Sequence, residues 1–144
     1  MISVIAVKLI LMFLSIDIMV GDSQYFSDNT IVSILEERFT NQRTEYDLLG
    51  HNFYQHKNEM IFQVEVLVNL KNINDAILFC FESINTLTNI SENDFTHAIL
   101  ILHFENDLAP IIAKADLSCS KKYLLKSKEN EYQWRKHCLS IQTQ

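Results

Sequence analysis

Residues 60–70, MIFQVEVLVNL, decide the fold of this 144-residue chain because their apolar side chains recur at every second position. Every second residue of a β-strand lies on the same face, and here one face is formed by Phe62, Val64, Val66 and Val68. The stretch therefore predicts a strand with one fully apolar face, which a layer of helices or a second sheet must cover.

Two further strands are expected later in the chain. Residues 96–104, THAILILHF, are apolar on both faces between their histidines, which is typical of a central strand covered on both sides. Residues 110–119 alternate instead, and one face is lined by Ile111, Ala113, Ala115, Leu117 and Cys119. The other face carries Lys114, Asp116 and Ser118, so we expect it to contact water.

Three stretches have the spacing of amphipathic helices. The first starts at a cap formed by Ser27 or Asp28, and its apolar stripe is Ile31, Ile34, Leu35 and Phe39. The second follows Asn74 as N-cap, with a stripe of Ile77, Cys80, Phe81, Ile84 and Leu87. The third covers residues 128–141, with a stripe of Trp134, Cys138 and Ile141.

Residues 44–58 are ambiguous, and we expect a short strand after Gly50 that contains Phe53 and Tyr54, followed by a turn at residues 56–58. The resulting element order is α-β-β-α-β-β-α. It predicts an α+β fold: a small single-domain sandwich with a mixed or antiparallel sheet of three to four strands and three helices.

The N-terminal segment 1–23 has the features of a signal peptide. Residues 1–20 are apolar apart from Ser3, Lys8, Ser15 and Asp17, and small residues follow that suit cleavage after Ser23. As a membrane span the segment is marginal, since Asp17 would cost about 3 kcal/mol in the hydrocarbon. We expect an exported protein, periplasmic or secreted, with one domain over 24–144. The alternatives are an uncleaved membrane anchor and an apolar element buried in an intracellular fold.

The cysteines also bear on whether the chain is exported. Cys119 ends the apolar face of an expected strand, and Cys138 lies on the apolar stripe of the helix that follows it. Export to an oxidising compartment would favour a disulfide between them, worth about 3 kcal/mol, whereas two buried thiols are the alternative. Cys80 lies mid-stripe on its helix and is expected to be a core residue.

Several kinds of catalytic and binding site are excluded or disfavoured. With only Gly21 and Gly50, the chain has no phosphate-binding loop, no dinucleotide fingerprint and no nucleophile elbow. The histidines lack the spacing of a zinc site, and His97 and His103 lie about 20 Å apart along one strand face. We therefore name no catalytic, cofactor-binding or metal-binding residue and expect no cofactor.

Charge is distributed unevenly along the chain. Residues 1–113 carry a formal net charge of −10, and residues 114–144 one of +4. The basic segment with its aromatic residue is a possible contact surface, formed by Lys121, Lys122, Tyr123, Lys126, Lys128, Arg135 and Lys136. Because the whole chain has a net charge of −6, we expect no nucleic-acid partner, and the alternative is that this segment packs beside the acidic remainder.

These observations favour a small exported protein that binds another protein without catalysis, through an exposed sheet edge or the basic segment. A transient contact with an anionic membrane surface is a further alternative. One alternative is an enzyme with a Cys/His or carboxylate site assembled in space. Another is an intracellular chaperone or immunity-like protein whose apolar N-terminus belongs to the fold. One N-glycosylation sequon, Asn89-Ile90-Ser91, occurs in an expected polar break.

Overall fold

The computed structural model describes residues 24–41, 45–123, 125 and 127–143, so the expected leader over 1–23 lies outside the described residues. Two helices and two strands form the first half: α2 (Asp28–Asn41), β1 (Tyr46–His56), β2 (Glu59–Val68) and, after the 3₁₀ turn η1 (Leu70–Asn72), α3 (Ile73–Ile90). The second half contains β3 (His97–His103), β4 (Ile111–Asp116), α4 (Leu117–Ser120), α5 (Lys128–His137) and β5 (Leu139–Thr143).

The strands form one mixed sheet in the order β1-β2-β3-β4-β5. Strands β2 and β3 are parallel, and α3 is the crossover that connects them. The other three pairs are antiparallel. The α+β class and the mixed sheet are therefore confirmed, and the described residues contain five strands where the sequence predicts three to four and four α-helices where it predicts three.

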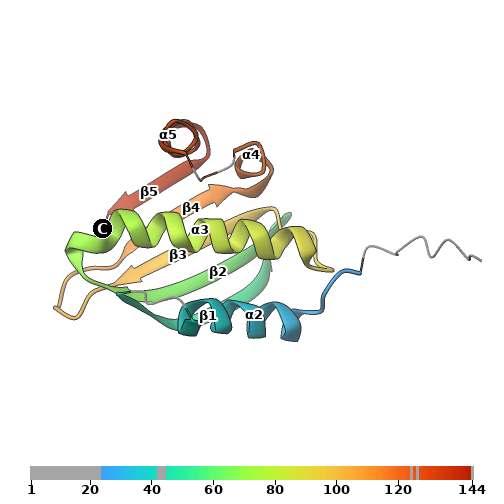
Figure 1. The fold of residues 1–144 in the computed structure, drawn as a ribbon, viewed down its shortest axis with the longest axis horizontal. Helices are drawn as coiled ribbons and strands as arrows, with labels where there is room; N and C mark the ends of the chain where they lie inside the picture. The colour runs from blue at the N-terminus through green and yellow to red at the C-terminus, as the bar shows by residue number, and fades with distance from the viewer. Residues whose placement is uncertain (1–23, 42–44, 124, 126, 144) are drawn as a thin grey trace, which may run out of the picture.

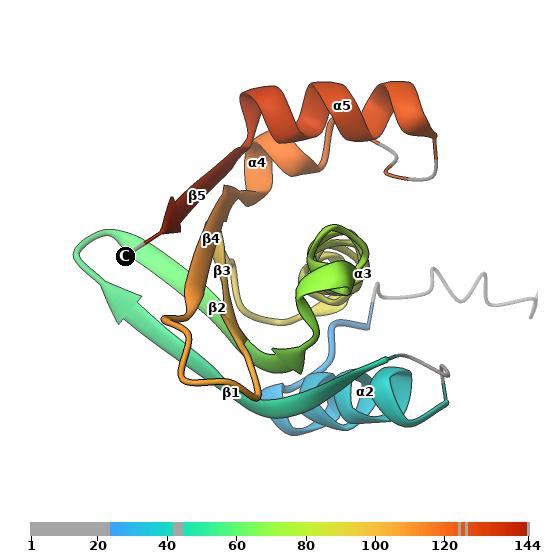
Figure 2. The same cartoon turned by 90° about the vertical axis from the view of Figure 1, so that its left-hand side faces the viewer.

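The helices all lie on one face of the sheet, with α3 across its middle, α2 beside β1 and α5 beside β5 (Figure 1). Seen end-on, the sheet curves around α3, so the helices occupy its concave side (Figure 2). The convex face is not covered by any helix or strand that the structure describes. This one-sided arrangement gives the molecule two layers and leaves half of the sheet surface open.

The core lies between α3 and the concave face of the sheet. The four alternating residues of β2 are buried as expected: Phe62, Val64, Val66 and Val68. The stripe of α3 that faces them is buried as well, and consists of Ile77, Cys80, Phe81, Ile84 and Leu87. From α2, Ile31 and Leu35 complete this cluster. Alternation in β2 and helical spacing in α3 therefore predict the same interface from its two sides.

The expectation that the strand at residues 96–104 is covered on both faces is wrong. Along β3 only Ala98, Leu100 and Leu102 are buried, and the residues between them are half-buried on the open face. No described helix or strand covers that face, because the β2–α3–β3 and α4–α5 connections both run over the concave side.

Strand β1 is longer than the short strand expected after Gly50. It begins at Tyr46 and pairs with β2 along its whole length, with one irregularity between Leu48 and Gly50. The extra residue there, Leu49, is a β-bulge that shifts the alternation by one position. The expected turn is confirmed: residues 57 and 58 connect the two strands, and Lys57 has a φ of 55°.

Three boundaries in the chain differ from those expected. Helix α3 starts before Asn74, and its N-cap is Asn72, which makes no side-chain cap bond. The strand expected at residues 110–119 ends at Asp116, which instead caps the short helix α4 through a bond from Cys119 N to its Oδ1 at 2.7 Å. The last helix ends at His137, and Ile141 lies in β5 with 49% of its surface exposed.

Candidate functional site

The C-terminal elements are joined by a disulfide between Cys119 in α4 and Cys138 at the end of α5, with their Cα atoms 5.5 Å apart. This is the pairing that the sequence predicts. Trp134 lies beside it, fully buried, and contacts the ring of Phe81 in α3 at a centroid distance of 5.3 Å. The bond and the tryptophan together fix α4 and α5 to the rest of the helical layer.

Neither of these cysteines is free to act as a nucleophile while the disulfide is intact, because both sulfurs are in the bond. The third, Cys80, is 1% exposed, and burial raises the pKa of its thiol far above the ordinary value. The structure therefore gives no support to a catalytic Cys/His pair among the described residues.

The residues of the basic contact surface expected from the sequence lie in and around α4 and α5. Lys121 and Lys122 follow α4 and are exposed, as are Lys128 and Lys136 at the two ends of α5. Tyr123 is half-buried and packs against the core, and Lys126 lies outside the described residues.

Arg135 has a structural role within this segment. Its guanidinium donates to Glu131 at 2.9 Å and, from a second nitrogen, to the backbone carbonyl of Asn74 in α3 at 2.9 Å. It also lies 5.9 Å from the centre of the Trp134 ring. Because these contacts use Arg135 to hold α5 against α3, it is less available to a partner than the lysines.

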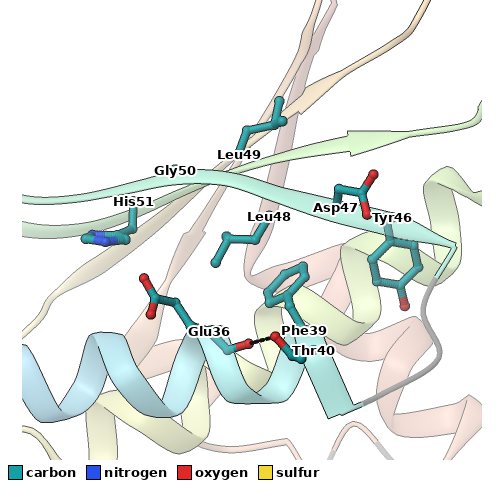
Figure 3. Close-up of a pocket in the computed structure, with 9 residues that line it drawn as sticks. All are labelled: Glu36, Phe39, Thr40, Tyr46, Asp47, Leu48, Leu49, Gly50 and His51. Carbon is teal, nitrogen blue, oxygen red and sulfur yellow. Dashed lines mark hydrogen bonds between the residues drawn. The ribbon is translucent and has the colours of Figure 1, made fainter.

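A hollow of about 570 Å³ lies between α2 and β1, beside the bulge. In the close-up, Leu48 and His51 point from the strand towards α2, while Leu49 points away on the opposite side (Figure 3). Glu36 extends from α2 towards the strand, and its backbone carbonyl accepts a bond from Thr40 Oγ1 at 3.0 Å. One wall is made of Phe39 and Tyr46, whose rings contact each other and Phe79 in the core.

The open face of the sheet carries two ordered polar clusters. The first is a chain of hydrogen bonds across three strands: Tyr54 Oη donates to Gln63 Oε1 at 3.1 Å, and Gln63 Nε2 donates to Glu65 Oε1 at 3.0 Å. The second oxygen of Glu65 lies 2.9 Å from His103 Nε2. These hydrogen bonds therefore fix four side chains from β1, β2 and β3 on a surface that no described element covers.

The second polar cluster lies at the other end of the same face. Lys114 Nζ donates to Glu59 Oε2 at 2.7 Å, and His97 Nε2 lies 3.7 Å from Glu59 and 3.8 Å from Asp116. The hydrogen bond from Lys114 is the main reason why the pKa of Glu59 is below its ordinary value, with the nearby histidines and the Lys114 charge assisting.

Three half-buried isoleucines of β3 and β4 lie next to these clusters, and Ile99 lies between Gln63 of the first and Lys114 of the second. In the register of the sheet, Ile101 lies beside Glu65 on one side and Ile112 on the other, and Ile99 lies beside Lys114. Leu49, at the bulge, is 53% exposed. Leu49 is on the other side of Glu65 from them, so we call the three isoleucines, Ile99, Ile101 and Ile112, together the aliphatic row. The open face thus combines an aliphatic row with charged side chains held by hydrogen bonds.

Sequence reasoning missed this face because its residues come from four strands whose partners and register were not known. One signal was present: the expected outer face of β4 already carried Lys114 and Asp116, with histidines at both ends of β3.

No group of three or more potential metal ligands occurs among the residues that the structure describes. In the same part of the chain, no helix is long and apolar enough to cross a membrane. Comparisons of the chain with protein-family models, with curated proteins and with solved structures found no match. The function must therefore be inferred from the geometry of this chain.

Proposed function

We propose that this chain is a small exported domain that binds another protein, without catalysis, through the open face of its sheet. The observation that carries the proposal is the aliphatic row next to two hydrogen-bonded polar clusters, one with Glu65 and the other with Glu59 and Lys114, on a face that no described element covers. Side chains held by hydrogen bonds before binding lose little conformational freedom when a partner docks, which favours recognition. The disulfide supports the exported location, since such bonds persist in oxidising compartments.

The shape of the face favours a different protein over a second copy of the chain. Five strands about 4.8 Å apart, with 5 to 11 residues of roughly 3.3 Å each, give a face of roughly 600 Å². A stable interface buries about 800 Å² on each partner. The face is also convex, and two convex faces would touch over less than the full area (Figure 2). A concave or flexible partner can cover it more completely.

The charges on the open face indicate which side chains a partner should present. Glu59, Glu65 and Asp116 contribute three negative charges to the face, and Lys114 one positive charge. A complementary partner therefore presents apolar side chains flanked by lysine or arginine. Such charge complementarity acts mainly on the association rate and on partner choice, so binding should weaken as salt rises.

The test uses a photo-crosslinking amino acid at Gly50, which lies beside Glu65 on the open face and has no atom within 4 Å of an added Cβ. The full chain is irradiated in extracellular fluid or periplasmic extract of its source, and adducts are identified by mass spectrometry. A matched control carries the crosslinker at Tyr132, which is 63% exposed on α5. We expect one dominant adduct from Gly50 that is absent from Tyr132.

A competition experiment ties that adduct to the aliphatic row. Excess unlabelled chain should suppress crosslinking, whereas excess Ile101→Thr/Ile112→Thr chain should be at least fivefold less effective. Threonine keeps the β-branched shape that strands favour, so the variant should fold, which a thermal melt checks. Equal adducts from Gly50 and Tyr132, or equal competition by the variant, would overturn the proposal. An adduct with a second copy, or with residues 1–23 of the chain itself, would do so as well.

A further inference from the structure

A hollow of about 330 Å³ lies in the helical layer, where α3 ends, and Asn89 of the sequon lines it. Asn89 is exposed on the last turn of α3, and the chain has no second Asn-X-Ser or Asn-X-Thr sequence. The other residues that line the hollow are Tyr25, Thr88, Ser91, Glu92, Asp94 and Lys121. The hollow therefore has one largely exposed aromatic ring, with 59% exposure at Tyr25, among hydroxyl, carboxylate and ammonium groups.

We infer that Asn89 is an N-glycosylation site and that the first sugar of the glycan occupies this hollow, with a face against Tyr25. A sugar ring presents C–H faces and hydroxyls, and the hollow offers a match for both: the ring of Tyr25 for a C–H face, and the mainly polar remainder of the lining for the hydroxyls. The inference rests on the exported location in the proposed function, and it applies to a eukaryotic secretory pathway.

The chemical step forms a bond between Asn89 Nδ2 and the anomeric carbon of a lipid-diphosphate-linked oligosaccharide. The bond from that carbon to the phosphate oxygen breaks, the lipid diphosphate leaves, and a base of the oligosaccharyltransferase takes the proton of the amide. Ser91 is 5% exposed in the folded domain, and its hydroxyl accepts a bond from Asn93 N at 3.1 Å. Because the transferase reads that hydroxyl, transfer must precede the folding of α3, as it does during translocation.

The position of the glycan is compatible with the docking face. The end of α3 belongs to the helical layer, on the concave side of the sheet (Figures 1 and 2). The aliphatic row lies on the convex side. A glycan at Asn89 would therefore leave the open face accessible while covering exposed polar surface of the helical layer.

The test expresses the full chain in eukaryotic cells in two forms: with its own N-terminus, and with a secretory signal of known activity placed before Met1. Intact mass is measured before and after treatment with a glycosidase. We expect one glycan per chain, lost in Asn89→Gln and retained in Ser91→Thr, the matched variant that keeps the hydroxyl. Secreted protein from the added signal without a glycan would overturn the inference.

The two forms separate this inference from the proposed function. If the chain with its own N-terminus stays inside the cells while the form with the added signal is secreted and glycosylated, the export proposal fails and the glycan site stands. If both forms are secreted without a glycan, export stands and the glycan site fails.

A second measurement tests the hollow itself. An endoglycosidase trims the glycan to a single N-acetylglucosamine, and we expect the trimmed protein to melt ~2 °C above Asn89→Gln. In the Tyr25→Ala background that difference should vanish. Equal melting temperatures in the wild-type background would show that the sugar extends into solvent, and would overturn its placement in the hollow.

Discussion

Trp134 is fully buried, and a single hydroxyl accepts the hydrogen bond from its indole N–H. Its indole Nε1–H donates to Ser120 Oγ at 2.9 Å, and that hydroxyl in turn donates to the carbonyl of Asp116 at 2.8 Å. Ser120 is itself 0% exposed, so water cannot replace it if the hydroxyl is removed. A short polar side chain in α4 therefore makes the burial of the largest aromatic residue possible.

We expect Ser120→Ala to lower the free energy of unfolding by about 1–3 kcal/mol, since it leaves the indole N–H buried without its acceptor. Ser118→Ala is the matched control, because Ser118 is exposed in the same short helix, and it should cost less than about 0.5 kcal/mol. Urea unfolding followed by tryptophan fluorescence measures both. Equal effects of the two substitutions would show that the bond to Trp134 does not stabilise the fold.

The ionisation of Tyr46 makes the stability of the fold depend on pH. Burial raises the pKa of Tyr46 to about 12 from an ordinary value of 10, with smaller contributions from Cys80, Asp75 and Glu82. The unfolded chain therefore releases this proton near pH 10, and the folded chain near pH 12. The stability due to the neutral phenol is complete below pH 10 and is lost as pH rises towards 12.

We expect the free energy of unfolding of the wild type to fall more steeply between pH 9.5 and 11.5 than that of Tyr46→Phe. Tyr132→Phe, at an exposed position, should keep the wild-type slope. Guanidinium unfolding at a series of pH values gives the slopes. The comparison uses slopes and not absolute stabilities, because Tyr46 has other interactions that the substitution can also change. Parallel curves for all three proteins would contradict the expectation.

At the scale of elements, periodicity predicts the central part of the fold and fails at its two edges. Strand β2 and helix α3 follow from regular patterns because each has one buried face. In β1, the bulge at Leu49 shifts the alternation, so the period of two breaks in mid-strand. In β5, Ile141 is at helical spacing from Trp134 and Cys138, and no glycine or proline marks the end of α5. Edge strands carry a weaker pattern because little of their surface is buried.

The disulfide is the strongest constraint on the C-terminal elements. Replacing both cysteines by serine should lower the free energy of unfolding by about 3 kcal/mol, since the sequence separation of 19 closes a loop of that order. A reductant should produce a similar loss in the wild type and none in the double variant. Differential scanning calorimetry measures all four samples. An unchanged melting temperature of the reduced wild type would show that the bond does not stabilise the fold.

At the scale of the whole molecule, the candidate site could not be predicted, although most of the layer that supports it could. Glu65 and His103 are 38 positions apart in the chain and meet only because β2 and β3 are parallel neighbours in a particular register. Lys114 and Glu59 meet across β3 in the same way. The composition shows which charged residues the chain has. Strand order and register decide which of them lie side by side on a sheet face, and periodicity does not predict strand order.

The convex open face also predicts the association state. We expect the chain to be a monomer at 100 µM by light scattering after size-exclusion chromatography, because the face is smaller than a stable homodimer interface and carries net negative charge. A dimer that Ile101→Thr/Ile112→Thr dissociates would contradict this expectation and identify a second copy as the occupant of the face.

The bond between Cys119 and Cys138 also matters when a protease cuts the backbone between these two residues. It ties the start of the α4–α5 connection to the end of α5, so that the backbone between them forms a covalent ring. A protease that nicks this ring leaves two fragments that are still joined, and β5 keeps its place against β4. The cut would become visible only under reducing conditions. The disulfide thus keeps β5 covalently attached to the rest of the domain after a single cut in this ring.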